Sequence, residues 1–374
     1  MTTSVAPPTT RVEALAATMI ELAGIPSVSG HEEQVRAYVA ARLGKLGLAT
    51  QVDAGGNLIA RMAGFPAKRD TEPPLLLNAH MDRVPPGKAH VPIRDGDLLR
   101  GDGTTNLGAD DSAGIAIILR TVETLLASKI SRPPLLLLFT TREEIGLQGA
   151  KAFDPAPWGV RDGIVFDNAG EPGDIVTRAA TYIAFDVTLH GVSGHPGKGF
   201  AGTVSAIEIF RKLRLKVGSV DGDLTRISLG RIEGGSARNA VPGEVRIQGE
   251  ARTLLTGAAQ ARLMRRIAAA FTRAAQSLGG SAASEFDAHC AGFDVAETEP
   301  MLAAWRAAAQ SVGLPSRMVT TFIGSDASAL RPHCRVLTVS TGAMEEHTSR
   351  EWVALTPLGD LVAAAVMMIR QWGR

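Results

Sequence analysis

Three solid runs of apolar residues punctuate the first half of the chain. They are PPLLLNAH at 73–80, PPLLLLFTT at 133–141 and DGIVFD at 162–167. Runs that lack polar alternation are typical of strands buried on both faces of a sheet. A long, largely apolar helix is predicted at 111–128, between the first two runs. The order strand, helix, strand predicts crossover connections and therefore a mostly parallel sheet.

The N-terminal part shows helical spacing instead. Apolar residues three and four apart predict a helix at 11–24. Ser29 and Glu32 have the spacing of a capping box, which predicts that a second helix begins there. The preceding stretch MTTSVAPPTT, residues 1–10, has no such pattern and is expected to be disordered.

The pattern changes near residue 175, where TYIAFDVTLHG alternates apolar and polar residues like a strand with one wet face. Helices are predicted next at 202–216 and 256–278, and strands at 225–232, 244–254 and 281–290. The α/β pattern then resumes to the C-terminus. The predicted fold class is α/β, with a main domain formed by 11–178 and 292–374 and an inserted α+β domain at 179–291.

Composition argues against several classes of function and says less about the fold. The formal net charge is +1, with 45% hydrophobic and 21% charged residues, so no strong field indicates nucleic acid or a membrane surface as partner. The two cysteines, Cys290 and Cys334, form no CxxC pair, which argues against a disulfide scaffold, a thiolate zinc site or a redox motif. The sequence shows no signal peptide and no apolar run of ~18 residues, so a soluble cytoplasmic protein is expected.

Polar side chains follow the apolar strands. His80 and Asp82 lie two residues apart, so both can face a site beyond the strand's carboxyl end, where open α/β sheets bind ligands. A histidine beside an aspartate suits a metal ligand whose second ring nitrogen is held by the carboxylate. A loop histidine with a structural partner is the alternative.

Asp110 and Asp111 begin the predicted helix at 111–128. Either one can be a simple N-cap, since aspartate is a preferred capping residue. Two adjacent acids exceed what a cap requires, and a carboxylate with two oxygens can bridge two cations.

Six such residues fall at or just beyond the ends of strands, or on the loops that leave them. They are His80, Asp110, Glu143, Glu144, Asp167 and His347. Two imidazoles and three carboxylates suit a pair of zinc or similar divalent ions. The remaining glutamate is then free to act as a base. His195 lies in a glycine-rich loop of the insert, where either a functional or a plain surface role is open.

Together these motifs resemble the zinc-dependent exopeptidase and deacylase superfamily, most closely its peptidase T-like, tripeptide aminopeptidase-like branch. The stretches that carry the resemblance run from about residue 70 to 355. They are NAHMDRVPPGK, LGADDSAGIA, TTREEIGLQGAK, GIVFDNAG, GVSGHPG, GRIEGGSARNAVPGEVRIQGEART and HTSREWV.

The resemblance implies two zinc ions per subunit, with cobalt or manganese as alternatives. It implies His80 and Asp167 on one ion, Glu144 and His347 on the other, and Asp110 bridging both. It also implies that Asp82 clamps His80, and that Glu143 is the general base acting on a water held between the metals.

In such relatives the insert is the lid and dimerisation domain. The resemblance therefore implies a homodimer in which His195 reaches the neighbouring active site and stabilises the oxyanion. It places Asn239 and Arg252 at lid positions that contact substrate, Arg252 through a carboxylate. Two positions depart from the pattern, since Ser112 stands where relatives commonly carry lysine and Arg83 where a small threonine is usual. Arg83 is expected to add a positive charge close to the substrate cleft.

The leading functional hypothesis is a di-zinc aminopeptidase acting on short peptides. A carboxypeptidase or an N-acyl-amino-acid deacylase of the same superfamily shares every motif and stays open. A non-catalytic binding homologue is the remote alternative, and it would predict loss of the base or of the ligands, none of which is missing.

Overall fold

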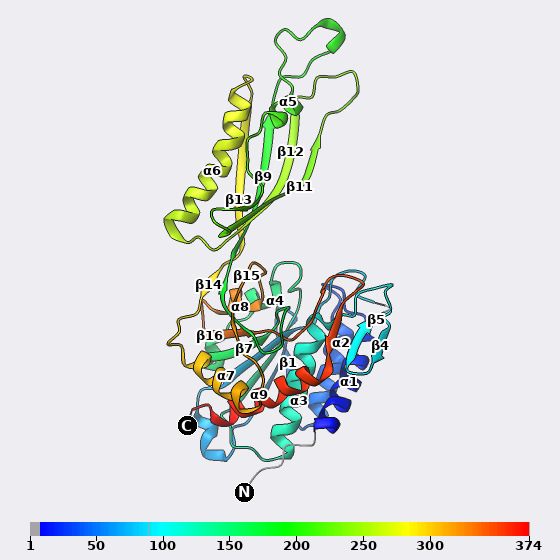
Figure 1. Ribbon diagram of the computed structural model, residues 1–374, viewed down its shortest axis with the longest axis vertical. Coiled ribbons are helices and arrows are strands. Elements are labelled where there is room, and N and C mark those ends of the chain that lie inside the picture. Colours follow the sequence, from blue (N-terminus) through cyan, green and yellow to red (C-terminus); the bar gives the residue numbers. More distant parts are fainter. Residues whose placement is uncertain (1–7, 89, 374) are drawn as a thin grey trace. The chain divides into compact units, whose positions relative to one another are not determined.

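The computed structural model describes residues 8–88 and 90–373, which divide into two compact units (Figure 1). The first unit contains the chain up to Arg178, Asp294–Thr320 and the part from Ser325 onwards. The second contains Ala179–Phe293 together with Thr321–Gly324. Within these described residues no helix combines the length and apolar composition needed to cross a membrane.

A nine-stranded sheet is the framework of the first unit in the described chain, in the order β1-β2-β6-β3-β7-β16-β8-β14, with β15 beside β8. Its strands are β1 (Thr50–Val52), β2 (Leu58–Met62), β3 (Leu75–His80), β6 (Leu135–Thr140), β7 (Asp162–Phe166), β8 (Ile175–Ala179), β14 (Phe293–Asp294), β15 (Met318–Thr321) and β16 (Arg335–Val339). The three predicted apolar runs form β3, β6 and β7, in which every residue is buried.

The central pairs β3–β6, β3–β7 and β7–β16 are parallel, whereas β2 and β8 join them antiparallel. The predicted α/β class with a mostly parallel sheet is therefore confirmed. Because β3, β6, β7 and β16 run in the same direction, their carboxyl ends meet at one edge of the sheet. Residues far apart in sequence become neighbours there.

Helices cover this sheet. They are α1 (Pro8–Ala23), α2 (Glu33–Lys45), α3 (Ala109–Ala127), α4 (Gln148–Ala152), α7 (Pro300–Ser311), α8 (Asp326–Leu330) and α9 (Leu355–Gln371), with short 3-10 turns η1 (Ala67–Thr71) and η2 (Ala156–Trp158). α3 packs on β3 and β7, and α1, α3 and α9 contact one another. A small sheet, β4 (Pro92–Asp95), β5 (Leu98–Gly101) and β17 (Trp352–Ala354), was not predicted from the pattern.

Two local predictions at the N-terminus are corrected. Of the segment expected to be disordered, residues 1–7 lie outside the described residues, but residues 8–10 are helical, because proline favours the first turn of a helix. Ser29 and Glu32 do not form a capping box. The helix α2 begins at Glu33 without a side-chain cap, because both side chains bond elsewhere, as described below.

The second unit is a five-stranded antiparallel sheet, in the order β10-β11-β12-β9-β13, with helices packed on it. Its elements are β9 (Thr181–His190), η3 (Pro196–Lys198), α5 (Ala206–Arg211), β10 (Gly218–Val220), β11 (Thr225–Gly234), β12 (Glu244–Thr253), α6 (Gly257–Gln276) and β13 (Ser281–Cys290). Phe185 of β9 packs with Ile267 and Phe271 of α6 in its core.

The helix predicted at 202–216 is much shorter, since α5 spans only Ala206–Arg211. Gly202 has a positive φ of 73°, which a helix does not accommodate. Leu213 and Leu215 both pack against the core of the unit, and side chains two apart share a face in an extended segment rather than in a helix.

Four residues from a distant part of the sequence belong to the second unit, and we call Thr321–Gly324 the strap. Ala180 donates its amide to the Thr321 carbonyl at 3.0 Å. The Phe322 carbonyl accepts a 3.0 Å bond from Arg252 Nη1, and the Phe322 ring centroid lies 4.0 Å from the guanidinium carbon of Arg226. The strap is therefore held by its backbone and by its aromatic ring.

Candidate metal centre

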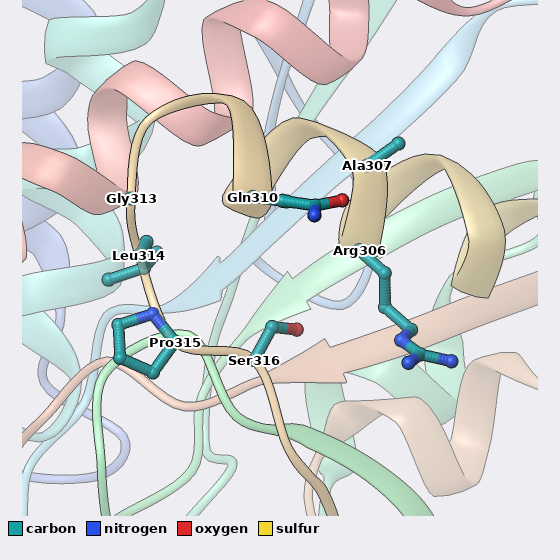
Figure 2. Close-up of a pocket in the computed structure, with 7 residues that line it drawn as sticks. All are labelled: Arg306, Ala307, Gln310, Gly313, Leu314, Pro315 and Ser316. Carbon is teal, nitrogen blue, oxygen red and sulfur yellow. The ribbon is translucent and has the colours of Figure 1, made fainter.

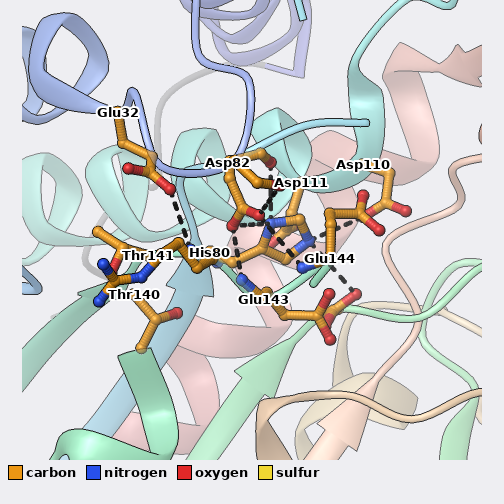
Figure 3. Close-up of polar contacts among 12 residues, drawn as sticks. Glu32, His80, Asp82, Asp110, Asp111, Thr140, Thr141, Glu143 and Glu144 are labelled. Atoms are coloured by element: carbon orange, nitrogen blue, oxygen red, sulfur yellow. Dashed lines mark hydrogen bonds and ion pairs between the residues drawn. The ribbon is translucent and has the colours of Figure 1, made fainter. Parts of the chain in front are cut away.

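The carboxyl edge of the large sheet gathers the predicted ligands, of which His80, Asp110 and Glu144 are labelled in Figure 3 together with Glu143. His80 ends β3, Glu143 and Glu144 follow β6, and Asp167 follows β7 directly. Asp110 lies at the start of α3, where its backbone is not helical and its peptide bond to Asp111 is cis.

Asp110 stands between the two histidines. Its Oδ1 lies 3.0 Å from His80 Nε2, and its Oδ2 lies 3.1 Å from His347 Nε2. His347 Nε2 is also 3.1 Å from Glu144 Oε1, and His80 Nε2 is 4.0 Å from Asp167 Oδ1. The two oxygens of one carboxylate thus face two different groups of side chains.

These side chains form groups with the spacing of metal ligands. In each group the ligand atoms lie within 4.8 Å of one another, and the groups are His80–Asp110–Asp167, Asp110–Glu144–His347 and His80–Glu143–Glu144. The first two share Asp110, as expected of a bridging ligand. Proximity to His80 alone does not separate the two glutamates, but only Glu144 also contacts His347.

Asp82 holds several groups in place at this edge of the sheet. His80 Nδ1 lies 3.0 Å from the Asp82 carbonyl and 3.5 Å from its Oδ1, which leaves Nε2 facing the ligand group. The Asp82 carboxylate also accepts the amides of Glu143 at 2.8 Å and Glu144 at 3.1 Å, and the Ser29 hydroxyl at 2.7 Å. The clamp predicted for His80 therefore also fixes the backbone of the glutamate pair.

Charge is concentrated at this site. Burial raises the pKa values of Glu143 and Asp167 well above the ordinary range, and the negative charge each carboxylate feels from its neighbours adds to the effect. Burial opposes ionisation of Asp110 too, but hydrogen bonds with His347 and His80 outweigh it and lower the pKa. Bonds to Asp110 and Glu144 raise the pKa of His347 to about 10. Such a cluster of acids suits a cation.

Some residues that shape the site have no distinctive sequence signal. Glu32 Oε1 accepts the amides of Gly30 at 2.8 Å and Arg142 at 3.0 Å, which holds the turn before Glu143 (Figure 3). Because Ser29 and Glu32 also fit a capping pattern, sequence reasoning assigned them to a helix. Glu351, a few residues beyond the last predicted ligand, was missed and has no motif of its own.

Two further acids are structural here. Asp111 Oδ2 accepts the His80 amide at 3.1 Å and Oδ1 accepts the Gly114 amide at 2.9 Å, so it joins the end of β3 to α3. Glu351, which is fully buried, accepts the amides of Gly108 at 2.7 Å and Asp110 at 3.0 Å. Both acids hold backbone around the bridging carboxylate.

The expectation that Arg83 adds charge to the substrate cleft is wrong. Arg83 is only 2% exposed. Its guanidinium donates to the carbonyls of Leu22 at 2.8 Å and Ile25 at 3.0 Å, and to the Ser112 hydroxyl at 2.6 Å. The end of α1 supplies the carbonyls that a buried guanidinium needs, so the side chain turns inward.

The remaining predicted residues belong to the second unit. His195 is exposed after β9, and its Nδ1 accepts the Gly197 amide at 3.1 Å. Asn239 is exposed in the loop between β11 and β12. Arg252 on β12 is already bonded, since Nε lies 3.1 Å from Glu250 Oε1 and the guanidinium lies over the Tyr182 ring.

A separate surface pocket of about 540 Å³ lies beside α7 (Figure 2). Arg306, Gln310 and Ser316 supply its polar side chains. Its lining contains no carboxylate, imidazole or thiol, so it has none of the side chains that hold zinc.

Comparison with known proteins identifies the family of the chain. Residues 76–371 match the model of Peptidase family M20/M25/M40. The chain belongs to this family. A protein of Bacillus subtilis, the uncharacterized YqjE, is 31% identical to this member of the M20 family over 361 residues, 94% of this chain and 95% of that one.

Two solved structures share the M20 fold of the chain. The aminopeptidase PepT of Bacillus cereus superposes on this chain with a TM-score of 0.85, and a tripeptidase of Staphylococcus aureus with a TM-score of 0.88. Each is 28% identical to this chain, and each match covers 96% of this chain and 98% of the other. The resemblance predicted from the motifs is confirmed. This M20 chain is a hydrolytic metallopeptidase, with side chains suited to metal at the edge of its sheet.

Proposed function

We propose that the chain is a peptidase T-like aminopeptidase that cleaves short peptides and holds two zinc ions per subunit. The observation that supports this most directly is the position of Asp110, whose two oxygens face His80 and His347 separately. A single carboxylate whose two oxygens face two histidines separately suits a site that holds two metal ions.

The side chains fit such a pair of ions. Each of the two groups that share Asp110 offers one imidazole nitrogen and carboxylate oxygens, which are common zinc ligands. Asp167 Oδ2 is buried without a hydrogen-bond partner among the described residues, so a cation would satisfy it. The cations would also neutralise the negative charge of the neighbouring carboxylates, which raise one another's pKa values. When bound, two such ions polarise a carbonyl and lower the pKa of a water.

Glu143 is proposed as the general base. The Asp82 carboxylate fixes the backbone of both glutamates, but only Glu144 contacts His347 and is proposed as the ligand. The Glu143 carboxylate would take a proton from the attacking water and later deliver it to the leaving amine. Burial raises its pKa, which suits a group that must hold that proton between the two steps.

The second unit is proposed to be the lid and the dimer contact. Because His195 Nδ1 accepts an amide proton, a neutral imidazole carries its own proton on Nε2 and can donate it. We propose that it donates to the developing oxyanion of the partner subunit. Asn239 and Arg252 are proposed to contact substrate, although Arg252 would have to share its guanidinium with Glu250. A cytoplasmic location stays a prediction.

A matched set of tripeptides tests the substrate class. We expect release of the N-terminal residue from a free tripeptide and no turnover of the N-acetylated form, because an aminopeptidase must bind the free amine. Cleavage of N-acyl amino acids alone would instead establish the deacylase alternative, and release of the C-terminal residue first would establish a carboxypeptidase. Elemental analysis of the purified protein should give two zinc ions per chain.

A further inference from the structure

Arg83 and Ser112, the two positions at which the sequence departs from the motifs it resembles, touch each other. Arg83 Nη2 lies 2.6 Å from Ser112 Oγ, and both residues are 2% exposed. We propose that Arg83 and Ser112 form one positioning unit for Asp110, in which position 83 supplies the buried positive charge that a lysine at position 112 would otherwise supply. This inference rests on the proposed role of Asp110 as the bridging ligand.

The guanidinium of Arg83 joins three segments. It bonds to carbonyls of Leu22, in the last turn of α1, and of Ile25, while its own amide donates to the Ser27 carbonyl at 2.8 Å. The last carbonyls of a helix carry partial negative charge, which favours a cation there. Its remaining bond, to Ser112, reaches the first turn of α3. Arg83 therefore connects the first turn of α3 to the end of α1.

The loop before Asp110 rests directly on this side chain. A Cβ atom added at Gly108 would lie only 2.6 Å from Arg83 Nε, so the guanidinium and the Gly108 backbone are in close contact. Glu351 holds the same loop by accepting the amides of Gly108 and Asp110. Burial raises the pKa of the fully buried Glu351 to about 7, and the Arg83 guanidinium opposes that rise by electrostatic attraction.

The two positions are linked through one buried charge. Removing Arg83 takes away the guanidinium that favours the ionised form of Glu351, and the Gly108 backbone loses the side chain against which it rests. Adding a lysine at Ser112 while Arg83 remains puts two cations into one buried space. Making both changes together restores a single positive charge in the same place. The two sites should therefore couple rather than act independently.

The test is a double-mutant cycle of R83T, S112K and R83T/S112K. Zinc affinity is measured by competition with a chelator, and thermal unfolding is measured on the metal-free proteins. Each single change should weaken zinc binding by about 10–100-fold, the range typical for residues that orient ligands, and the double variant should recover most of that loss. Additive losses in the double variant would overturn the proposal, as would wild-type affinity in both single variants.

A second pair covers the case in which S112K does not fold. R83K keeps the charge and R83Q removes it, so R83K should bind zinc more tightly than R83Q. Equal affinities would refute a role for the charge. The matched control is R132T, because Arg132 is 6% exposed and donates to backbone carbonyls of Leu125 and Ile130, before β6. It should lower the unfolding temperature and leave zinc affinity unchanged. A wild-type protein without zinc affinity would refute the proposed function instead.

Discussion

Replacing Asp82 by asparagine should disturb both halves of the metal centre at once. The Asp82 side chain is completely buried, and its two oxygens accept three hydrogen bonds, from the amides of Glu143 and Glu144 and from the Ser29 hydroxyl. Asparagine has nearly the same shape, but it offers one oxygen and one NH₂ group. Whichever way the amide turns, one backbone N–H of the glutamate pair must face a donor.

The size of the effect follows from those contacts. A buried N–H left without an acceptor costs about 1–3 kcal/mol, and the other bonds lose the extra strength that an ionised acceptor gives them. We therefore expect D82N to lower the unfolding free energy of the metal-free protein by about 2–4 kcal/mol. His80 also loses the carboxylate near its Nδ1, and such changes typically cost about 10–100-fold in metal affinity.

S29A is the matched control, because it removes one of the three donors and leaves the carboxylate intact. Its cost should be about 1 kcal/mol, with metal affinity close to that of the wild type. Denaturant unfolding of the metal-free proteins and zinc titration against a chelator measure the two quantities. Zinc affinity in D82N that equals the S29A value would refute the idea that the Asp82 carboxylate organises the centre.

Variants at four further acids separate the roles of these residues. E143A should keep both metals by elemental analysis and lose about 10²–10⁴-fold in kcat, whereas E144A should lose metal; the reverse metal contents would exchange the two assignments. D110N should reduce the zinc content of both sites together, because one carboxylate serves both, and loss of a single ion would contradict a bridge. E32A should lower the unfolding free energy by about 1–3 kcal/mol, because it leaves the Arg142 amide in a buried space without an acceptor. E32Q keeps an acceptor oxygen and should lower it less. Equal unfolding midpoints of the two variants in denaturant would count against this reason.

The proposed ligands could be brought together from sequence because strand ends are visible there. His80 and Asp167 come directly after apolar runs, and parallel strands bring their carboxyl ends together, so the pattern indicates both position and neighbourhood. The residues that hold the ligands are different. Ser29 and Glu32 are distant in sequence from the groups they bond, and a helix-capping pattern explains them equally well until Asp82 and Arg142 are seen beside them.

Arg83 shows the same limit for charge. A sequence states that a cation follows Asp82, but not whether its side chain turns toward solvent or toward the interior. That choice depends on the carbonyls of Leu22 and Ile25, at and just beyond the end of α1, which accept hydrogen bonds from the guanidinium. Likewise the short α5 could not be predicted from composition, since Leu213 and Leu215 suit a helix until the sheet beneath them is known.

The strap at Thr321–Gly324 bears on how the second unit can be exchanged or removed. A deletion of Ala179–Phe293 as one continuous block would leave Phe322 behind, although its ring and carbonyl are matched to Arg226 and Arg252 of the deleted part. A graft of Ala179–Phe293 into a relative would face the converse mismatch, because its two arginines would arrive without the ring and carbonyl that receive them here. The second unit is therefore not formed by one continuous segment of the chain. A chimera must carry over both Ala179–Phe293 and the strap.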